Sequence, residues 1–484
     1  MPKYSEEIQK ALNEIKRALY EKSVRSLWQL GRAIGCCNRP TDTKKDALVD
    51  SIMAIAENRA EPVTPSKRGA PVKSKEYDKE LADKILYFRS VIKGEIENYP
   101  PNIIEVNQNS AHIASEEGVI SGVLQSTDSG WYLRVDKCYI TPERDACIPS
   151  EMVTEFDLRC GDNISVKATK NKNGLGFTAV SLVSVNGVRP DMLIKRANFN
   201  SFIPCYGKNY YKLSLAENNL TNRVIDLFTP IALGARALVV GPSKSGKSSF
   251  LKEMAKAIKK ADANNQVIFV SIAERPEEIT EAIQELKGIE VAYSTFDTAE
   301  QNHLNTAILA GERAKRLVEA GKDTVLILDS LTKVVKACNA RLNEKSFPVG
   351  EFSPNAFLCA KKIFGSARHV NNGASLTIIA SVEAHSGSVA DEYIYSQFKD
   401  GANTEIVLNK ALSQNKLFPA IDIKASGTRR EELLLSGEEI ALSSKLKNLL
   451  DEGKAYAQIY ELFNKTQSNA ELLASSQKLI GEIK

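Results

Sequence analysis

The sequence contains little that would hold a transition metal or cross a membrane. Its eight cysteines include no C-x-x-C pair, and only four histidines are present. Scattered thiols in a long chain favour packing roles in a reducing compartment over a zinc site. No apolar run approaches the length of about 18 residues that a transmembrane helix needs, and the amino terminus lacks the pattern of a signal peptide. These absences predict a cytoplasmic protein with no membrane contact.

Charge of one sign is also scarce. The formal net charge of the 484 residues is only +4, so any affinity for nucleic acid must come from local patches. The 43% hydrophobic and 26% charged residues are ordinary for a globular protein. A chain of this length predicts two to four domains, since a domain typically holds about 100–200 residues.

A phosphate-binding motif lies near the middle of the chain. Apolar residues 237–240 predict a buried strand, and a helical pattern opens at Ser248. Between them Gly241, Gly246 and Lys247 complete the pattern G-x-x-x-x-G-K-[ST]. Glycines let backbone N–H groups curl around nucleotide phosphates, the lysine reaches the β- and γ-phosphates, and the serine hydroxyl ligates Mg²⁺. The motif therefore predicts a nucleotide and Mg²⁺ as cofactors.

Two carboxylates follow apolar strands in the same region. Asp329 ends the strand predicted at 324–328, and such an aspartate orients Mg²⁺ through its water shell. Glu274 follows the strand predicted at 267–272 and could polarise the water that attacks the γ-phosphate. The alternative for Glu274 is a charge at a helix N-terminus beside Pro276.

Two further side chains lie far downstream. Arg429 belongs to a basic, glycine-containing run, and in a ring ATPase an arginine from the next subunit neutralises charge in the transition state. A surface arginine pair with Arg430 is the other interpretation. Phe418 could stack on adenine or belong to the core.

Strand and helix patterns divide the chain into six parts. Strands that alternate with helices after the phosphate-binding motif predict a mostly parallel sheet covered on both faces. The predicted parts are an N-terminal helical unit (1–60), a basic linker with a helical segment (61–117), an OB-type β-barrel (118–190), a connector (191–222), a RecA-type P-loop ATPase domain (223–442) and a C-terminal helical segment (443–484).

The barrel carries the aromatic stretch of most interest. Its five short predicted strands lie at 119–124, 130–134, 138–140, 163–168 and 177–185. Trp131 and Tyr132 are adjacent on one strand and so point to opposite faces, with Arg134 two residues on. One ring at most belongs to the core, and an exposed ring would be a base-stacking platform. The alternative places one ring in the core and one at an edge.

Several runs together resemble the bacterial transcription termination factor Rho family. They occur in the family's order over some 220 residues and comprise 224–231, the phosphate-binding motif, 274–278, 329–330, 373–380, 418–422 and 426–434. Residues 23–60 and 118–188 resemble the family's RNA-binding domain more weakly.

The resemblance implies a RecA-type homohexamer that hydrolyses ATP between subunits and moves along RNA from 5′ to 3′. It implies single-stranded RNA on the barrels and in the central pore, and a transcribing RNA polymerase as the complex from which RNA is pulled. The implied catalytic residues are Glu274, Arg275, Lys247, Arg429 and Lys416; those for nucleotide and Mg²⁺ are Gly241, Lys244, Ser245, Gly246, Lys247, Ser248, Ser249, Phe418 and Asp329; those for RNA are Trp131, Tyr132, Arg134, Lys345 and Ser388.

The RNA-facing positions depart from the family pattern. Cys147 stands where the family has a tyrosine, and the pore segment around Ser388 has Val389 in place of a lysine. The family's second arginine is Lys416 here, which keeps the charge but loses bidentate geometry. Two other interpretations stay open: an RNA-binding ring with weak or no ATP turnover that acts as a regulator, and a DNA-directed RecA-type motor or rotary-ATPase-like subunit.

Overall fold

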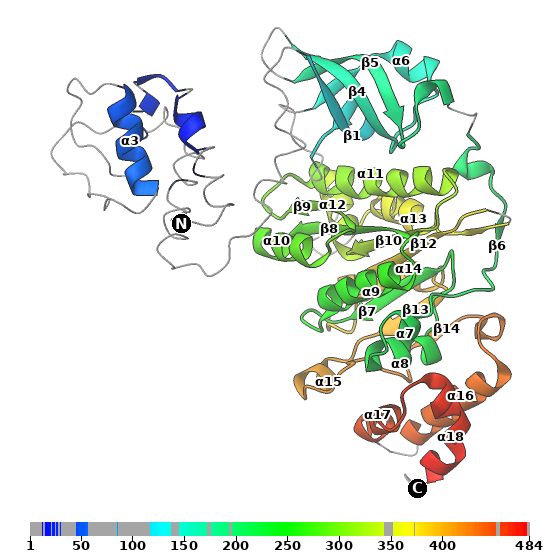
Figure 1. Cartoon of the computed structure of the whole chain (residues 1–484). Helices are drawn as coiled ribbons and strands as arrows, with labels where there is room; N and C mark the ends of the chain where they lie inside the picture. Colours follow the sequence, from blue (N-terminus) through cyan, green and yellow to red (C-terminus); the bar gives the residue numbers. More distant parts are fainter. Residues whose placement is uncertain are drawn as a thin grey trace. The chain divides into compact units, whose positions relative to one another are not determined.

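The computed structural model describes most of the chain after residue 116. The described residues are 117–481 without 137–144, 172–175, 193–195, 343–351, 372 and 452–454, and before them 45–56, residue 85 and scattered positions between 12 and 30. The chain divides into two compact units, 1–112 and 113–484, which we describe separately (Figure 1). The predicted basic linker (61–117) lies outside the described residues except at positions 85 and 117.

The N-terminal unit is helical where it is described. Residues 15–20 are helical, and helix α3 spans Lys45–Ala56. Leu48, Ile52 and Ile55 are buried on one side of α3, at the spacing of a single helical face. The described part of this unit is therefore helical, as the predicted N-terminal helical unit requires.

The second unit begins with a closed barrel of five strands in the order β1-β2-β3-β5-β4. Its strands are β1 (Glu117–Thr127), β2 (Gly130–Arg134), β3 (Ala146–Ile148), β4 (Asn163–Lys170) and β5 (Phe177–Val185), with helix α6 (Ser150–Glu155) between β3 and β4. Alternate residues of β4, such as Ile164 and Val166, point into the barrel core. The predicted barrel is confirmed, although β3 and α6 were not expected and the strand predicted at 138–140 lies outside the described residues.

A mixed seven-stranded sheet follows, in the order β14-β13-β7-β12-β10-β8-β9. Its strands are β7 (Arg236–Gly241), β8 (Gln266–Glu274), β9 (Glu290–Thr295), β10 (Thr324–Asp329), β12 (Leu376–Glu383), β13 (Thr404–Val407) and β14 (Gly427–Thr428). All neighbours are parallel except β13 and β14. A two-stranded sheet joins β6 (Pro204–Cys205) to β11 (His369–Val370). The expected mostly parallel sheet is confirmed.

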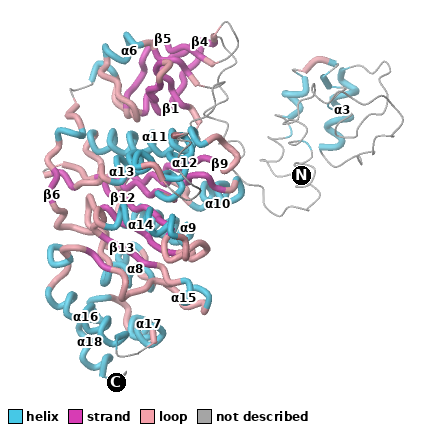
Figure 2. The backbone as a smooth tube through the Cα atoms, turned by 180° about the vertical axis from the view of Figure 1, so that it is seen from behind, coloured by secondary structure: helices cyan, strands magenta, loops and turns pink. Residues whose placement is uncertain are grey.

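Helices cover both faces of this sheet, because its strands are apolar on both sides (Figures 1 and 2). The apolar cluster of one face includes α8 (Leu220–Phe228), α9 (Lys247–Ala261) and α10 (Pro276–Glu285). The C-terminal helices α16 (Gly437–Asp451), α17 (Tyr456–Asn464) and α18 (Asn469–Gly481) join this cluster, with α16 and α17 packed against α8. The other face packs against α11 (Glu300–Glu319), α12 (Leu331–Arg341), α13 (Leu358–Phe364) and α14 (Val389–Lys399). Short elements are α7 (Leu213–Ala216), α15 (Lys410–Gln414), and the 3₁₀ turns η1 (Pro190–Met192), η2 (Phe199–Ser201), η3 (Pro354–Phe357) and η4 (Glu431–Leu433). Helix α16 crosses the domain boundary expected at 442, and that boundary stays a prediction.

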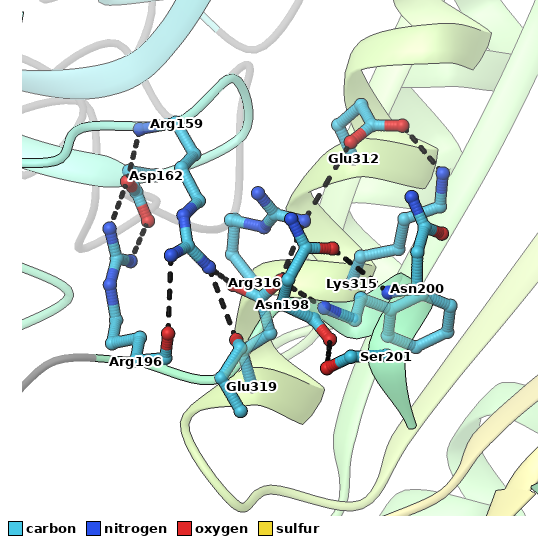
Figure 3. Close-up of polar contacts among 12 residues, drawn as sticks. Arg159, Asp162, Arg196, Asn198, Asn200, Ser201, Glu312, Lys315, Arg316 and Glu319 are labelled. Carbon is cyan, nitrogen blue, oxygen red and sulfur yellow. Dashed lines mark hydrogen bonds and ion pairs between the residues drawn. The ribbon is translucent and has the colours of Figure 1, made fainter. Parts of the chain in front are cut away.

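The barrel is docked on helix α11 by buried charges (Figure 3). The Glu319 carboxylate is fully buried and accepts hydrogen bonds from the Phe199 N–H at 2.7 Å and from the Arg159 guanidinium at 3.2 Å. It also pairs with Arg316 at 2.9 Å. At Gly161, with φ of +91°, an added Cβ would lie 2.4 Å from the backbone of Glu312. The barrel loop therefore touches the helix backbone directly, and only glycine permits that approach.

Candidate nucleotide and RNA sites

The phosphate-binding turn links β7 to α9. Lys244 and Gly246 both adopt left-handed backbone conformations, with φ of 61° and 87°. Lys247 is the first residue of α9, and its Nζ donates to the backbone oxygens of Gly241 at 2.9 Å and Pro242 at 2.7 Å. The ammonium group is thus folded back over the turn at the helix N-terminus, where an anion would bind. The expected strand, turn and helix are all present.

Two buried polar groups show that this turn is suited to bind phosphate. Burial lowers the pKa of Lys247, while the carboxylates of Glu383 and Asp329 act in the opposite direction. The Ser245 hydroxyl is buried and has no hydrogen-bond partner among the described residues. An unpartnered hydroxyl and a desolvated ammonium on one turn are stabilised by an anion. The turn contains all the predicted phosphate ligands: Gly241, Lys244, Ser245, Gly246, Lys247, Ser248 and Ser249.

The two predicted carboxylates lie at the same edge of the sheet as this turn. Asp329 ends β10, and its Oδ1 accepts a hydrogen bond of 2.6 Å from the Ser381 hydroxyl of the neighbouring strand. Glu274 ends β8, and its Oε2 lies 2.6 Å from the Nζ of Lys333. Because β7, β12, β10 and β8 are parallel neighbours, their carboxyl ends meet at one edge. We call this the carboxyl edge.

Three other predicted residues also lie at the carboxyl edge. The segment after β13 lies beside the phosphate-binding turn (the P-loop), where the Leu408 N–H donates to the Val240 oxygen at 2.7 Å. Phe418, with 60% of its surface exposed, and Lys416, which is exposed, lie on the loop that returns from this segment. Arg275 is exposed at the N-cap of α10, directly after Glu274. An exposed phenyl ring near the turn is placed to stack on a base.

Arg429 lies at the opposite edge of the sheet. Strand β14 pairs antiparallel with β13, so that Thr428 faces Thr404, the first residue of β13. The Arg429 N–H donates to the Asn403 oxygen at 2.7 Å, and its guanidinium donates to the Asp400 oxygen at 3.1 Å. The length of β7 separates this amino edge from the P-loop, about 17 Å at 3.3 Å per residue. The structure therefore does not bring Arg429 to the P-loop of its own chain.

Several arginines gather around Arg429 on the amino edge. A cavity of ≈ 370 Å³ there is lined by Arg429, Arg430, Arg236, Arg368 and Tyr206. The guanidinium of Arg430 lies over the Tyr206 ring at 4.4 Å from its centroid. Burial lowers the pKa of both Arg236 and Arg368. Nothing in the sequence singled out Arg236 or Arg368, because one arginine at or just before the start of a strand has no distinguishing pattern.

The barrel separates the two predicted aromatic residues. Trp131 packs against the barrel core, whereas Tyr132 lines a cleft of ≈ 300 Å³ together with Arg134, Cys147 and Phe177. The alternation along β2 explains this, because Tyr132 and Arg134 share one face and Trp131 points to the other. Of the two rings, only Tyr132 is on the cleft side.

Arg134 is held firmly within the cleft. Its Nε donates to the Gln125 side chain at 2.6 Å, its Nη1 pairs with the Asp145 carboxylate, and its guanidinium lies 5.4 Å from the Tyr132 ring centroid. Burial raises the pKa of Asp145, and the adjacent Arg134 counteracts the rise. The pair fixes a cation beside an aromatic ring, an arrangement suited to a stacked base and its phosphate.

Of the two predicted pore residues, one is described. Ser388 caps α14, where its hydroxyl accepts from the Asp391 N–H at 3.4 Å, and the following Val389 is 85% exposed. Lys345 lies outside the described residues. Among the described helices, none combines the length and apolar composition that a bilayer crossing requires.

Comparison with known proteins agrees with this architecture. Residues 221–428 match the ATP synthase alpha/beta family, nucleotide-binding domain. The transcription termination factor Rho of Bacillus subtilis is 34% identical over 391 residues, which are 80% of this chain and 90% of that protein. The Rho proteins of Streptomyces lividans and Mycobacterium bovis are 37% and 36% identical over 74% of this chain, but only 52% and 61% of their own lengths are covered.

Solved structures are more distant. An ATPase of the type III secretion system of pathogenic bacteria covers 54% of this chain, which covers 84% of that structure, with 20% identity and a TM-score of 0.45. The identity to the Bacillus protein over most of both lengths decides the family. This chain belongs to the transcription termination factor Rho family and carries a nucleotide-binding domain of the ATP synthase alpha/beta type.

Proposed function

We propose that this protein is an RNA-dependent ATPase that moves along RNA from 5′ to 3′ and terminates transcription. One observation carries the proposal. The carboxyl edge of the sheet gathers Lys247, Asp329 and Glu274, while Arg429 is held at the amino edge. A complete hydrolytic site then requires two chains, as in a ring ATPase with an arginine supplied in trans.

The carboxyl edge binds and activates ATP in this proposal. Backbone N–H groups of the turn, the Ser245 hydroxyl and Lys247 hold the phosphates. Ser248 and Asp329 would hold Mg²⁺, which would neutralise charge on the phosphates. Glu274 accepts the proton of the attacking water, and the ion pair with Lys333 orients that carboxylate. Phe418 stacks on the adenine.

The amino edge of a neighbouring chain completes the site. Arg429 of the neighbouring chain reaches the γ-phosphate across the interface. Lys416 and Arg275, at the carboxyl edge of the chain that binds the nucleotide, are further cations near it. The Arg429 contact joins two different surfaces, so it repeats head to tail and gives a ring where the rotation between subunits closes. Membership of the Rho family supports a homohexamer as that ring.

RNA binds first on the barrels. Tyr132 and Arg134 line the cleft that takes a stacked base, and the segments around Lys345 and Ser388 contact RNA in the central pore. The relatives' name, transcription termination factor, supports a transcribing RNA polymerase complex in the cytoplasm as the target. Pulling the transcript from that complex is the expected outcome of translocation.

Steady-state ATP hydrolysis tests the proposal. We expect the full chain to hydrolyse ATP faster with poly(C) or poly(U) than with single-stranded DNA or no nucleic acid. The Glu274→Gln chain, which retains its size but lacks the base, should lose about 10²- to 10⁴-fold in rate. RNA binding without stimulated hydrolysis would contradict the motor and favour an RNA-binding regulatory ring, and equal stimulation by DNA would contradict RNA specificity.

A further inference from the structure

Glu274 follows an irregular point in the sheet. Along β8 and β9, Ser271 pairs with Tyr293 and Glu274 pairs with Thr295, so two residues of β8 oppose Ser294 alone. Ala273, within this bulge, has a left-handed backbone with φ of 49°. A bulge leaves a backbone group unpaired and re-aims the side chain that follows it. An alanine at positive φ is sparsely populated and persists only where its surroundings hold it.

A buried hydroxyl holds the bulge. The N–H of Ala273 donates to the Oγ of Ser294 at 3.2 Å, and the same oxygen lies 2.9 Å from the Nδ1 of His303. The side chains of both Ser294 and His303 are almost wholly buried. A hydroxyl donates one hydrogen bond and accepts two, so it can donate to His303 and accept from Ala273 at the same time.

The contact with His303 can take two forms. A neutral ring with its proton on Nε2 accepts from the Ser294 hydroxyl at Nδ1, whereas a proton on Nδ1 makes the ring the donor. Burial lowers the pKa of His303, the Lys333 ammonium lowers it further, and Glu300 acts in the opposite direction. In both forms the Ser294 oxygen can accept from the Ala273 N–H.

We propose that Ser294 and His303 are positioning residues for the Glu274 carboxylate. The pair fixes the backbone before Glu274 through the Ala273 N–H, while Lys333 fixes the carboxylate at 2.6 Å from the other side. The proposal rests on the proposed function, in which Glu274 acts on the attacking water. Without the Ser294 hydroxyl, the Ala273 N–H loses its partner, the bulge relaxes and the carboxylate leaves its place.

The test compares Ser294→Ala with Ser294→Thr in the full chain with ATP and RNA. Ser294→Ala should lower kcat by about 10²-fold, the loss typical of a small misplacement of a reacting group. The KM for ATP should stay within about twofold, because the phosphate-binding turn is untouched. Ser294→Thr keeps the hydroxyl and should retain most of the activity. Thermal unfolding of each chain checks that it is folded.

A second measurement separates positioning from a general effect on folding. In the Glu274→Gln background, single-turnover hydrolysis of radiolabelled ATP should show no further loss on adding Ser294→Ala, because residues acting through one group are not additive. An equal further loss in that background, or full activity of the Ser294→Ala chain beside an impaired Glu274→Gln chain, would overturn the positioning role. Unchanged turnover in Glu274→Gln alone would instead overturn the proposed function, and the positioning role with it.

Discussion

The two edges of the parallel sheet differ in what they hold and in how they are held. The carboxyl edge carries acids and one buried lysine, and each contacts other residues of its own chain, as Asp329 does with Ser381 and Glu274 does with Lys333. The amino edge carries arginines around an open cavity, and Arg429 contacts only backbone oxygen through its guanidinium in the described structure. One edge is a preorganised site, and the other is a set of cations ready for an acidic or phosphorylated partner.

This difference follows from chain direction. Parallel strands place the turns that follow them, and so the P-loop and the acids, at one edge. The antiparallel β14 runs the other way and delivers residue 429 to the opposite edge. A single antiparallel strand at the margin of the sheet therefore separates Arg429 from the P-loop and the acids, the other part of the proposed hydrolytic site.

The largest effect should come from removing Lys247, the buried lysine of the phosphate-binding turn. Lys247→Ala should reduce ATP turnover to background, because the charge that reaches the β- and γ-phosphates is lost. Lys252→Ala is the matched control, since Lys252 lies on the same helix but pairs with Glu281 at its surface. Steady-state hydrolysis with RNA measures both, and undiminished turnover in Lys247→Ala would remove the P-loop assignment.

Next in size should be the loss of the arginine at the amino edge. Arg429→Ala should lower the hydrolysis rate by about 10³-fold or more if the guanidinium acts in trans. Arg430→Ala is the control, because its side chain stacks on Tyr206 instead. Mixing Arg429→Ala chains with Lys247→Ala chains should restore part of the activity, since some interfaces then join two intact halves. A mixture no more active than its components would contradict a site shared between chains.

A smaller effect should come from the barrel, which belongs to neither edge. Tyr132→Ala should weaken RNA binding by about 1–3 kcal/mol, the contribution of one stacked base, and leave RNA-free hydrolysis unchanged. Trp131→Ala should instead lower the thermal stability of the barrel, because its ring packs against the core. Fluorescence anisotropy and thermal unfolding measure the two changes. Equal RNA binding by wild-type and Tyr132→Ala chains would exclude the cleft as a base platform.

The smallest effect should come from the exposed ring at the carboxyl edge. Phe418→Ala should raise the KM for ATP several-fold, since an aromatic stack contributes about 0.5–1.5 kcal/mol beyond area burial. Phe418→Tyr, which keeps the ring, should behave as wild type. Hydrolysis at varied ATP concentration separates KM from kcat, and an unchanged KM in Phe418→Ala would mean that the ring does not touch the base.

The sequence was sufficient for the features that depend on local spacing. The P-loop was predicted because its glycines, lysine and serine lie within eight residues, and Glu274 and Asp329 because apolar strands end at them. The sequence did not predict which of the two barrel aromatics faces the core. Alternation along the strand shows that Trp131 and Tyr132 point to opposite faces, but not which face is buried. That choice depends on strand pairing across the barrel.

Features that join distant segments could not be predicted. Strand β14 has only two residues, too few for a period-two pattern, so the edge on which Arg429 lies was hidden. Ser294 and His303 look like an ordinary strand serine and helix histidine until the fold brings them beside Ala273. The contact between Arg159 and Glu319 links residues 160 positions apart, and neither has a local pattern that marks it.

Helix α11 sets a limit on exchanging the barrel of this protein. Its C-terminal half receives the barrel through Glu319 and the close approach of Gly161, and its N-terminal half carries His303. A foreign barrel would need a glycine and an arginine at the matching positions of its own loop to seat on this helix. A graft that supplied both residues would leave α11 unchanged. A graft that needed changes at residues 312–319 would alter the helix that also carries His303.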